Sequence, residues 1–149
     1  MGVGAPTIAD ARDLARNEFK YNRSIGEAHH IDGGYVKFLG SEEPARWNGP
    51  QWSLLWADEL ALWNEASWHQ AQFGLRLGEY PKAIVTTTPK NRQFVRALSE
   101  LDTTATIRAT TYDNPNLSDA VQNRLRQQYG DTRIGRQEIM AEWLDDVPG

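Results

Sequence analysis

Short runs of strand-forming residues alternate with helical patterns through the first 110 residues, and this order constrains the possible fold more than any other feature. The runs that predict strands cover residues 2–7, 35–39, 52–56, 82–87 and 104–110, and helical spacing of apolar residues covers 8–19, 59–77 and 91–101. Strands that alternate with helices build a mainly parallel sheet covered by helices. The sequence therefore predicts an α/β fold.

The segments outside this alternation carry other patterns. Residues 20–34 are polar and end in Gly33-Gly34, which is typical of a loop. Helical patterns over 118–129 and 132–144 follow each other with no predicted strand between them, and Gly130 would end the first. These two helices predict a C-terminal helical appendage.

The composition excludes several classes of protein. The 149 residues hold 20 acidic and 16 basic side chains, and the net charge of −4 excludes a wholly basic nucleic-acid binder. A local basic patch is compatible with these counts, because 12 of the 16 cations are Arg, which suits phosphate contacts. The absence of cysteine excludes disulfides, cysteine zinc sites and cysteine nucleophiles. No apolar run approaches the roughly 18 residues of a membrane helix, so we expect no membrane partner.

Two adjacent carboxylates, Asp58 and Glu59, directly follow the most apolar of the predicted strands. In α/β proteins ligands bind beyond the carboxyl ends of the strands. At such a position Asp58 would hold Mg²⁺ through its water shell, and Glu59 would orient and deprotonate an attacking water. The alternative is that both acids begin the next helix, whose dipole favours negative charge there.

Three hydroxyl side chains, Thr86, Thr87 and Thr88, end another predicted strand just before Pro89. A threonine at a strand end can sense a γ-phosphate or its attacking water by hydrogen bonding. The alternative is that these β-branched residues only favour the strand conformation.

Basic residues in the last third of the chain suggest phosphate contacts. Thr132, Gly135 and Arg136 could open a helix toward a phosphate, and the alternative is a helix cap with solvated charges. A wider phosphate-contacting face could include Arg92, Arg96, Arg124, Arg126, Arg133 and Arg136. For each of these arginines, solvated helix surface is the alternative.

Histidine and tryptophan residues allow two further interpretations. His29, His30 and Asp32 could ligate a metal, but no fourth ligand has useful spacing, which favours a solvated loop. Five tryptophans could stack on single-stranded DNA, and their spacing favours packing in the core instead. They are Trp47, Trp52, Trp56, Trp63 and Trp68.

An ordered series of short segments resembles the large terminase subunit of tailed phages, and similar terminases of gene transfer agents. Its most distinctive members are Trp56-Ala57-Asp58-Glu59-Leu60-Ala61-Leu62-Trp63 and Thr86-Thr87-Thr88-Pro89-Lys90. The other matching segments are residues 5–7, 9–13, 41–44, 73–78, 111–114, 116–117, 132–138 and 144–149. The series covers nearly the whole chain and is more specific than any single motif.

This resemblance implies a DNA-packaging motor. It implies a P-loop NTPase of the additional-strand, catalytic-glutamate type that uses ATP and Mg²⁺. Asp58 matches the Walker B aspartate that holds the metal, Glu59 the catalytic glutamate, and Thr86, Thr87 and Thr88 the coupling motif. The implied partners are double-stranded DNA, the small terminase subunit, the portal and other large-terminase subunits, in the cytoplasm of a bacterial host.

The sequence departs from the family pattern in four places, one of which is residues 17–34, where no segment gives a good match. A P-loop needs Gly-x-x-x-x-Gly-Lys before Ser or Thr, and none of the four Lys has these neighbours. We therefore expect residues 1–149 to be a partial terminase ATPase domain without the P-loop segment and without the nuclease domain. Asn48 stands where family members commonly carry Arg, and Arg46 could compensate. Arg46, Arg133 and Arg136 are candidates for phosphate or inter-subunit contacts.

Two functions are compatible with these observations. The chain is either part of a motor ATPase, to which it supplies the Walker B and coupling residues, or a non-catalytic remnant or interaction module that binds other terminase or portal components. The missing P-loop motif predicts that the isolated chain is inactive. The intact Asp58-Glu59 pair and the threonine run favour a role in a motor.

Overall fold

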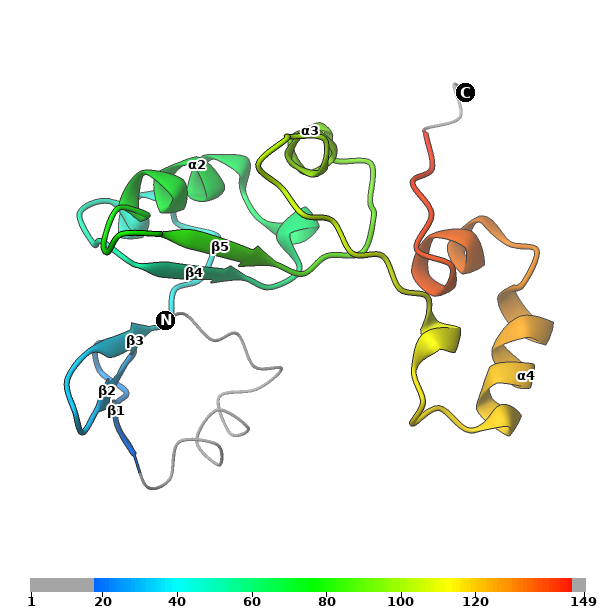
Figure 1. Cartoon of the computed structure of the whole chain (residues 1–149). Helices are drawn as coiled ribbons and strands as arrows, with labels where there is room; N and C mark the ends of the chain where they lie inside the picture. Colours follow the sequence, from blue (N-terminus) through cyan, green and yellow to red (C-terminus); the bar gives the residue numbers. More distant parts are fainter. Residues whose placement is uncertain (1–17, 146–149) are drawn as a thin grey trace. The chain divides into compact units, whose positions relative to one another are not determined.

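The computed structural model describes residues 18–145 (Figure 1), which divide into two compact units. The first unit ends at Thr86 and the second begins at Thr87. All β-strands of the described residues belong to the first unit, and the helices α3 and α4 belong to the second. The strand predicted over residues 2–7 and most of the helix predicted over 8–19 lie outside the described residues.

The first unit begins with a three-stranded antiparallel sheet. Its strands are β1 (Phe19–Asn22), β2 (Glu27–His30) and β3 (Tyr35–Lys37), in the order β1-β2-β3. The loop predicted over residues 20–34 is therefore wrong, and Phe19 begins a strand rather than ending a helix. The physical reason is that these strands expose one face, so polar residues alternate with half-buried ones and leave no apolar run.

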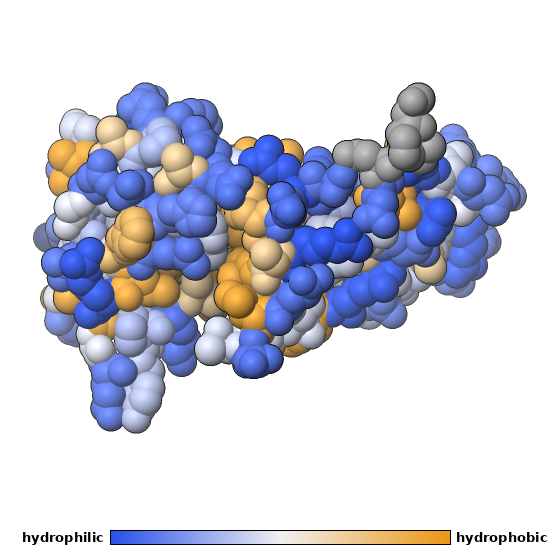
Figure 2. Space-filling model, turned by 90° about the horizontal axis from the view of Figure 1, so that it is seen from above, coloured by the Kyte–Doolittle hydropathy of each residue, from blue (hydrophilic) through white to orange (hydrophobic). Residues whose placement is uncertain are grey.

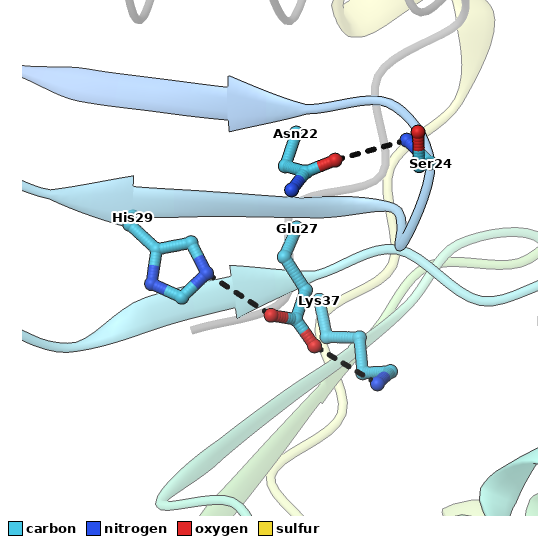
Figure 3. A network of polar contacts seen from close by, with 5 residues as sticks. All are labelled: Asn22, Ser24, Glu27, His29 and Lys37. Carbon is cyan, nitrogen blue, oxygen red and sulfur yellow. Dashed lines mark hydrogen bonds and ion pairs between the residues drawn. The ribbon is translucent and has the colours of Figure 1, made fainter.

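A polar network joins the second and third strands of this sheet (Figure 3). Lys37 Nζ donates a hydrogen bond to Glu27 Oε1 at 2.9 Å, and His29 Nε2 lies 3.0 Å from Glu27 Oε2. In the preceding turn, the Ser24 N–H donates to Asn22 Oδ1 at 3.0 Å. The Lys37 hydrogen bond holds the pKa of Glu27 below its ordinary value, because it stabilises the charged carboxylate.

The second sheet of this unit is a parallel pair. It consists of β4 (Leu54–Ala57) and β5 (Lys82–Val85), paired from Leu54↔Lys82 to Ala57↔Val85. This pair confirms the strands predicted near 52–56 and 82–87. A mainly parallel sheet is not what the described residues form, because β1, β2 and β3 are antiparallel. The fold is thus mixed α/β with a small parallel sheet.

Helical segments connect the two parallel strands. They are η2 (Leu60–Leu62) and α2 (Glu65–Gly74), and an earlier turn, η1 (Pro44–Trp47), precedes β4. Asn64 begins α2, since its side chain accepts a hydrogen bond from the Ala66 N–H at 3.0 Å. Figure 1 shows α2 along one face of the β4–β5 pair, and the Trp52 indole donates to the Ala71 carbonyl at 3.1 Å. The helix predicted over 59–77 is confirmed over α2.

Tryptophan rings and small side chains form the core of the first unit. Trp47, Trp63 and Trp68 are buried, which confirms the prediction of core packing for these three, and Trp52 and Trp56 are half-buried. The ring centroids of Trp47 and Trp63 lie 5.1 Å apart. Buried aromatic rings of this size contribute a large share of the hydrophobic stabilisation of a small unit.

The second unit is helical, with no strand among its described residues. It contains α3 (Gln93–Ser99), η3 (Thr111–Asp113), α4 (Asp119–Tyr129) and η4 (Gly135–Ile139). α3 and α4 confirm the helices predicted over 91–101 and 118–129, and Gly130 follows α4 as predicted. The strand predicted over 104–110 is wrong: its β-branched residues find no strand to pair with, and Ile107 is 94% exposed. The helix predicted over 132–144 ends near Met140, because Ala141 adopts a left-handed φ of 50°.

The described surface combines hydrophilic residues with hydrophobic patches (Figure 2). Its exposed large hydrophobic side chains include Leu62, Phe73 and Ile84. None of the helices within residues 18–145 has the length and apolar character that a bilayer crossing requires.

Candidate active site at the carboxyl ends of β4 and β5

The candidate site lies where the two parallel strands end. Ala57 and Val85 are the last register pair of β4 and β5, so the next residues, Asp58 and Thr86, leave the sheet at the same edge. The Thr86 N–H donates to the Ala57 carbonyl at 3.0 Å, which continues the pairing by one step. The structure therefore brings together Asp58 and Glu59 with Thr86, residues that the sequence placed on two separate strand ends.

One hydroxyl contacts both acidic residues. Thr86 Oγ1 donates a hydrogen bond to Asp58 Oδ1 at 2.5 Å, and it accepts one from the Glu59 N–H at 3.3 Å. Hydrogen bonds to an ionised carboxylate are shorter and stronger than those between neutral groups. The hydroxyl therefore orients the Asp58 carboxylate and holds the Glu59 backbone next to it.

The backbone of the turn after β4 is held from several sides. The Leu60 N–H donates to the Thr86 carbonyl at 3.0 Å, and the Trp63 indole N–H donates to the Asp58 carbonyl at 2.8 Å. Glu59 itself adopts the left-handed conformation, with φ 50° and ψ 51°. For a residue other than glycine this conformation costs roughly 1–2 kcal/mol. Such strain persists where the surrounding contacts over-determine it, and residues of this kind cluster at functional sites.

Helix capping does not account for the two acids. Glu59 occupies the position before η2, but its side chain makes no capping hydrogen bond. The helical turn that follows covers only Leu60–Leu62. The dipole of so short a segment is small, so the alternative interpretation of Asp58 and Glu59 as helix-starting acids has little support.

The residues at this edge fit a Mg²⁺ ion that is held mainly by water and substrate phosphates. Within residues 18–145, no group of three or more His, Cys, Asp and Glu side chains is placed to hold a metal. Mg²⁺ does not need such a cage, because it keeps several waters and binds one or two carboxylates together with phosphate oxygens. The Asp58 side chain is exposed and offers one such carboxylate, beside the Thr86 hydroxyl.

Comparison with known families decides where the chain belongs. The family described as terminase large subunit, T4likevirus-type, N-terminal, matches residues 8–149. The chain belongs to the terminase large subunit family. Its fold is shared with the large terminase of a thermophilic bacteriophage, solved in complex with ADP, at a TM-score of 0.73 and 17% sequence identity. A search of the curated proteins returns no match.

This terminase chain spans only part of the length of its structural relative. The alignment covers 92% of this chain and 36% of the thermophilic phage protein. The resemblance between the folds therefore concerns only a part of a large terminase, and the matching family description names the N-terminal part.

The other predicted residues of this terminase chain have different surroundings. Arg46 is exposed in η1, in the first unit. Thr87 and Thr88 belong to the second unit, where Thr87 Oγ1 donates to the Thr88 carbonyl at 3.0 Å. The roles predicted for these residues in coupling or phosphate contact stay predictions.

Three of the predicted phosphate-contacting arginines bind the protein itself. Arg133 donates to the Asp145 carbonyl at 2.7 Å, and Arg136 Nε forms an ion pair with Glu142 Oε2 at 2.7 Å. Asp145 also accepts from Arg96 at 2.7 Å, and this hydrogen bond raises the pKa of Arg96. In the described structure these side chains tie the segment after η4 to the rest of the second unit.

The histidine pair lies on a strand rather than in a loop. His29 and His30 are on β2, where His29 stacks on Tyr35 and His30 contacts Phe19 edge to face. His30 Nδ1 lies 3.8 Å from Asp32 Oδ2. Packing and ion pairs within the antiparallel sheet therefore account for these side chains, and no metal cluster forms around them in the described part of the chain.

One contact of the site is missing from the sequence analysis. The Trp63 indole reaches the Asp58 carbonyl, whereas the sequence assigned this ring to the core alone. A spacing of five residues across a left-handed turn has no periodic signature, so no sequence pattern could have indicated the contact.

Proposed function

We propose that this chain is part of the ATPase motor of a phage-type terminase large subunit, which packages double-stranded DNA into capsids. The observation that carries the proposal is the convergence of Asp58, Glu59 and Thr86 at the carboxyl ends of two parallel strands. Membership of the terminase family and the fold shared with the thermophilic phage protein support it. In this proposal the domain is of the additional-strand, catalytic-glutamate P-loop type.

Each residue has a separate task in the proposed hydrolysis. Asp58 holds Mg²⁺, which when bound neutralises negative charge on the nucleotide phosphates. Glu59 orients the attacking water and accepts its proton. Thr86 orients the Asp58 carboxylate and holds the Glu59 backbone through its hydroxyl, and Thr87 and Thr88 follow it in the chain as the rest of the coupling motif.

The phosphate-binding groups come from another segment in this proposal. The 149 residues hold no Gly-x-x-x-x-Gly-Lys sequence, whose backbone amides and lysine would cradle the β- and γ-phosphates. We propose that a segment carrying such a loop, in the same polypeptide or in another, completes the site. Double-stranded DNA, the small terminase subunit, the portal and further large-terminase subunits are the proposed partners, in the cytoplasm of a bacterial host.

The test is Mg²⁺-dependent ATP hydrolysis by the purified chain, alone and mixed with a polypeptide that carries the segment encoded immediately upstream. We expect turnover only in the mixture, and we expect Glu59→Gln to lower kcat by about 10²- to 10⁴-fold. Glu65→Gln is the matched control, because Glu65 is an exposed acid in the first turn of α2 and lies outside the site. Absence of turnover in every mixture would overturn the proposal and favour the non-catalytic interaction module.

A further inference from the structure

The peptide group between the two site carboxylates is held at both of its ends. Its carbonyl, which belongs to Asp58, accepts a hydrogen bond from the Trp63 indole N–H at 2.8 Å. Its N–H, which belongs to Glu59, donates to Thr86 Oγ1 at 3.3 Å. Two contacts on opposite ends of one peptide group fix the orientation of its plane.

We infer that Trp63 is a positioning residue for Glu59: its indole N–H holds the Asp58–Glu59 peptide plane and thereby the direction of the Glu59 carboxylate. The inference rests on the proposed function, because it assigns the residue to the reaction in which Glu59 would act. Trp63 does not itself touch the reacting atoms in this scheme.

The Trp63 ring is well placed to act as a fixed donor. The residue is buried, and its ring lies 5.1 Å from that of Trp47. Its backbone N–H donates to the Leu60 carbonyl at 3.0 Å, at the end of η2. Packing on the ring restricts its rotamers and the backbone bond holds the residue in place, so the indole N–H keeps its direction toward Asp58.

Glu59 is the residue that needs such a support. Its left-handed backbone is disfavoured for a side chain with a Cβ, and a rotation of the preceding peptide plane would relieve it. That rotation would also change the direction in which the Glu59 side chain leaves the backbone. A general base must lie within hydrogen-bonding reach of the water that it deprotonates, so a small rotation is costly for the rate.

Trp47 provides a matched control in the same aromatic cluster. It is also buried, and its indole N–H also donates to a backbone carbonyl, that of Gly40 at 3.1 Å. Trp63→Phe and Trp47→Phe thus remove the same donor from the same kind of ring and preserve an aromatic core. Only the Trp63 variant removes a bond to the site.

The first measurement is hydrogen exchange of the backbone amides, followed by NMR on the full chain. The three-bond scalar coupling between the amide proton and the Hα of Glu59 is recorded alongside it. For Trp63→Phe we expect the Glu59 amide to exchange about 2- to 10-fold faster relative to global unfolding, as for the loss of one hydrogen bond. We also expect its coupling constant to move away from the left-handed value. For Trp47→Phe we expect neither change. Equal effects of both variants, or no effect of Trp63→Phe, would overturn the inference.

The second measurement is steady-state ATP hydrolysis in the complemented mixture. We expect Trp63→Phe to lower kcat by about 10-fold with the KM for ATP unchanged, because the ring supports the base and not the nucleotide. An unchanged kcat with a mobile Glu59 amide would overturn the positioning role. If the unsubstituted mixture shows no turnover, the proposed function fails and the catalytic role of Trp63 fails with it. In that case the exchange data still test whether the Trp63 indole holds the peptide group between Asp58 and Glu59.

Discussion

Thr86 Oγ1 donates a hydrogen bond of 2.5 Å to Asp58 Oδ1, although 28 positions separate the two residues in the chain. The parallel register of β4 and β5 brings them to the same edge, because Ala57 and Val85 pair immediately before them. The same hydroxyl accepts the Glu59 N–H, so the first threonine of the proposed coupling motif contacts the Asp58 carboxylate and the backbone of Glu59.

Replacing the Thr86 hydroxyl tests this relationship directly. We expect Thr86→Val to lower kcat in the complemented hydrolysis assay by about 10- to 100-fold, as is usual for a partner that orients a metal-binding carboxylate. Thr86→Ser keeps the hydroxyl and should retain most of the activity. If the valine variant turned over ATP as fast as the serine variant, the hydroxyl would have no part in the reaction.

The left-handed backbone of Glu59 predicts an unusual order of stabilities. We expect Glu59→Gly to be more stable than Glu59→Ala by about 1 kcal/mol in urea unfolding, because only glycine adopts this conformation without strain. Both variants should be inactive. At His69, an exposed position in the interior of α2, the order should be reversed, since glycine in a helix interior is less favourable than alanine by about 1 kcal/mol. The same order at both positions would contradict the left-handed conformation of Glu59.

The Glu27 network predicts a pH-dependent contribution to the stability of the antiparallel sheet. Because Lys37 lowers the pKa of Glu27 in the folded chain, the stabilisation is fully present above the ordinary glutamate pKa. It is lost as the pH falls through the lowered pKa. We expect Glu27→Gln to lower the melting temperature at neutral pH and to converge with the unsubstituted chain in acid.

Thermal unfolding followed by circular dichroism between about pH 7 and pH 3 measures this convergence. Glu43→Gln is the control, because Glu43 is an exposed acid in the same unit. A constant difference between Glu27→Gln and the unsubstituted chain at every pH would contradict the prediction.

The ion pair between Arg136 and Glu142 predicts a structural role in the second unit. We expect Arg136→Ala to destabilise the chain by up to about 1 kcal/mol, the usual range for an exposed pair. Arg124→Ala, on the exposed surface of α4, should change stability less. Chemical denaturation of both variants compares them. An Arg136 variant as stable as the unsubstituted chain would instead leave this arginine available for a phosphate contact.

Local patterns in the sequence were sufficient to predict the parallel strands and the α-helices. Apolar runs indicated β4 and β5, and helical periodicity indicated α2, α3 and α4, because each of these elements buries one face or one stripe. The same patterns placed Asp58 and Thr86 at the ends of two predicted strands. Asp58 and Thr86 could therefore be singled out as site residues before the structure was known.

Tertiary structure decided what no local pattern encodes. The antiparallel sheet of β1, β2 and β3 exposes one face, so its strands look like a polar loop, whereas residues 104–110 have strand-forming side chains and no strand to pair with. The left-handed turn at Glu59 and the Trp63 contact depend on where the chain returns after β5 and how the tryptophan core packs. The sequence by itself determined that two strands end close to Asp58 and Thr86, because apolar periodicity is local. Only the tertiary structure decided how those residues contact each other, because hydrogen bonds between distant segments form after the strands have paired.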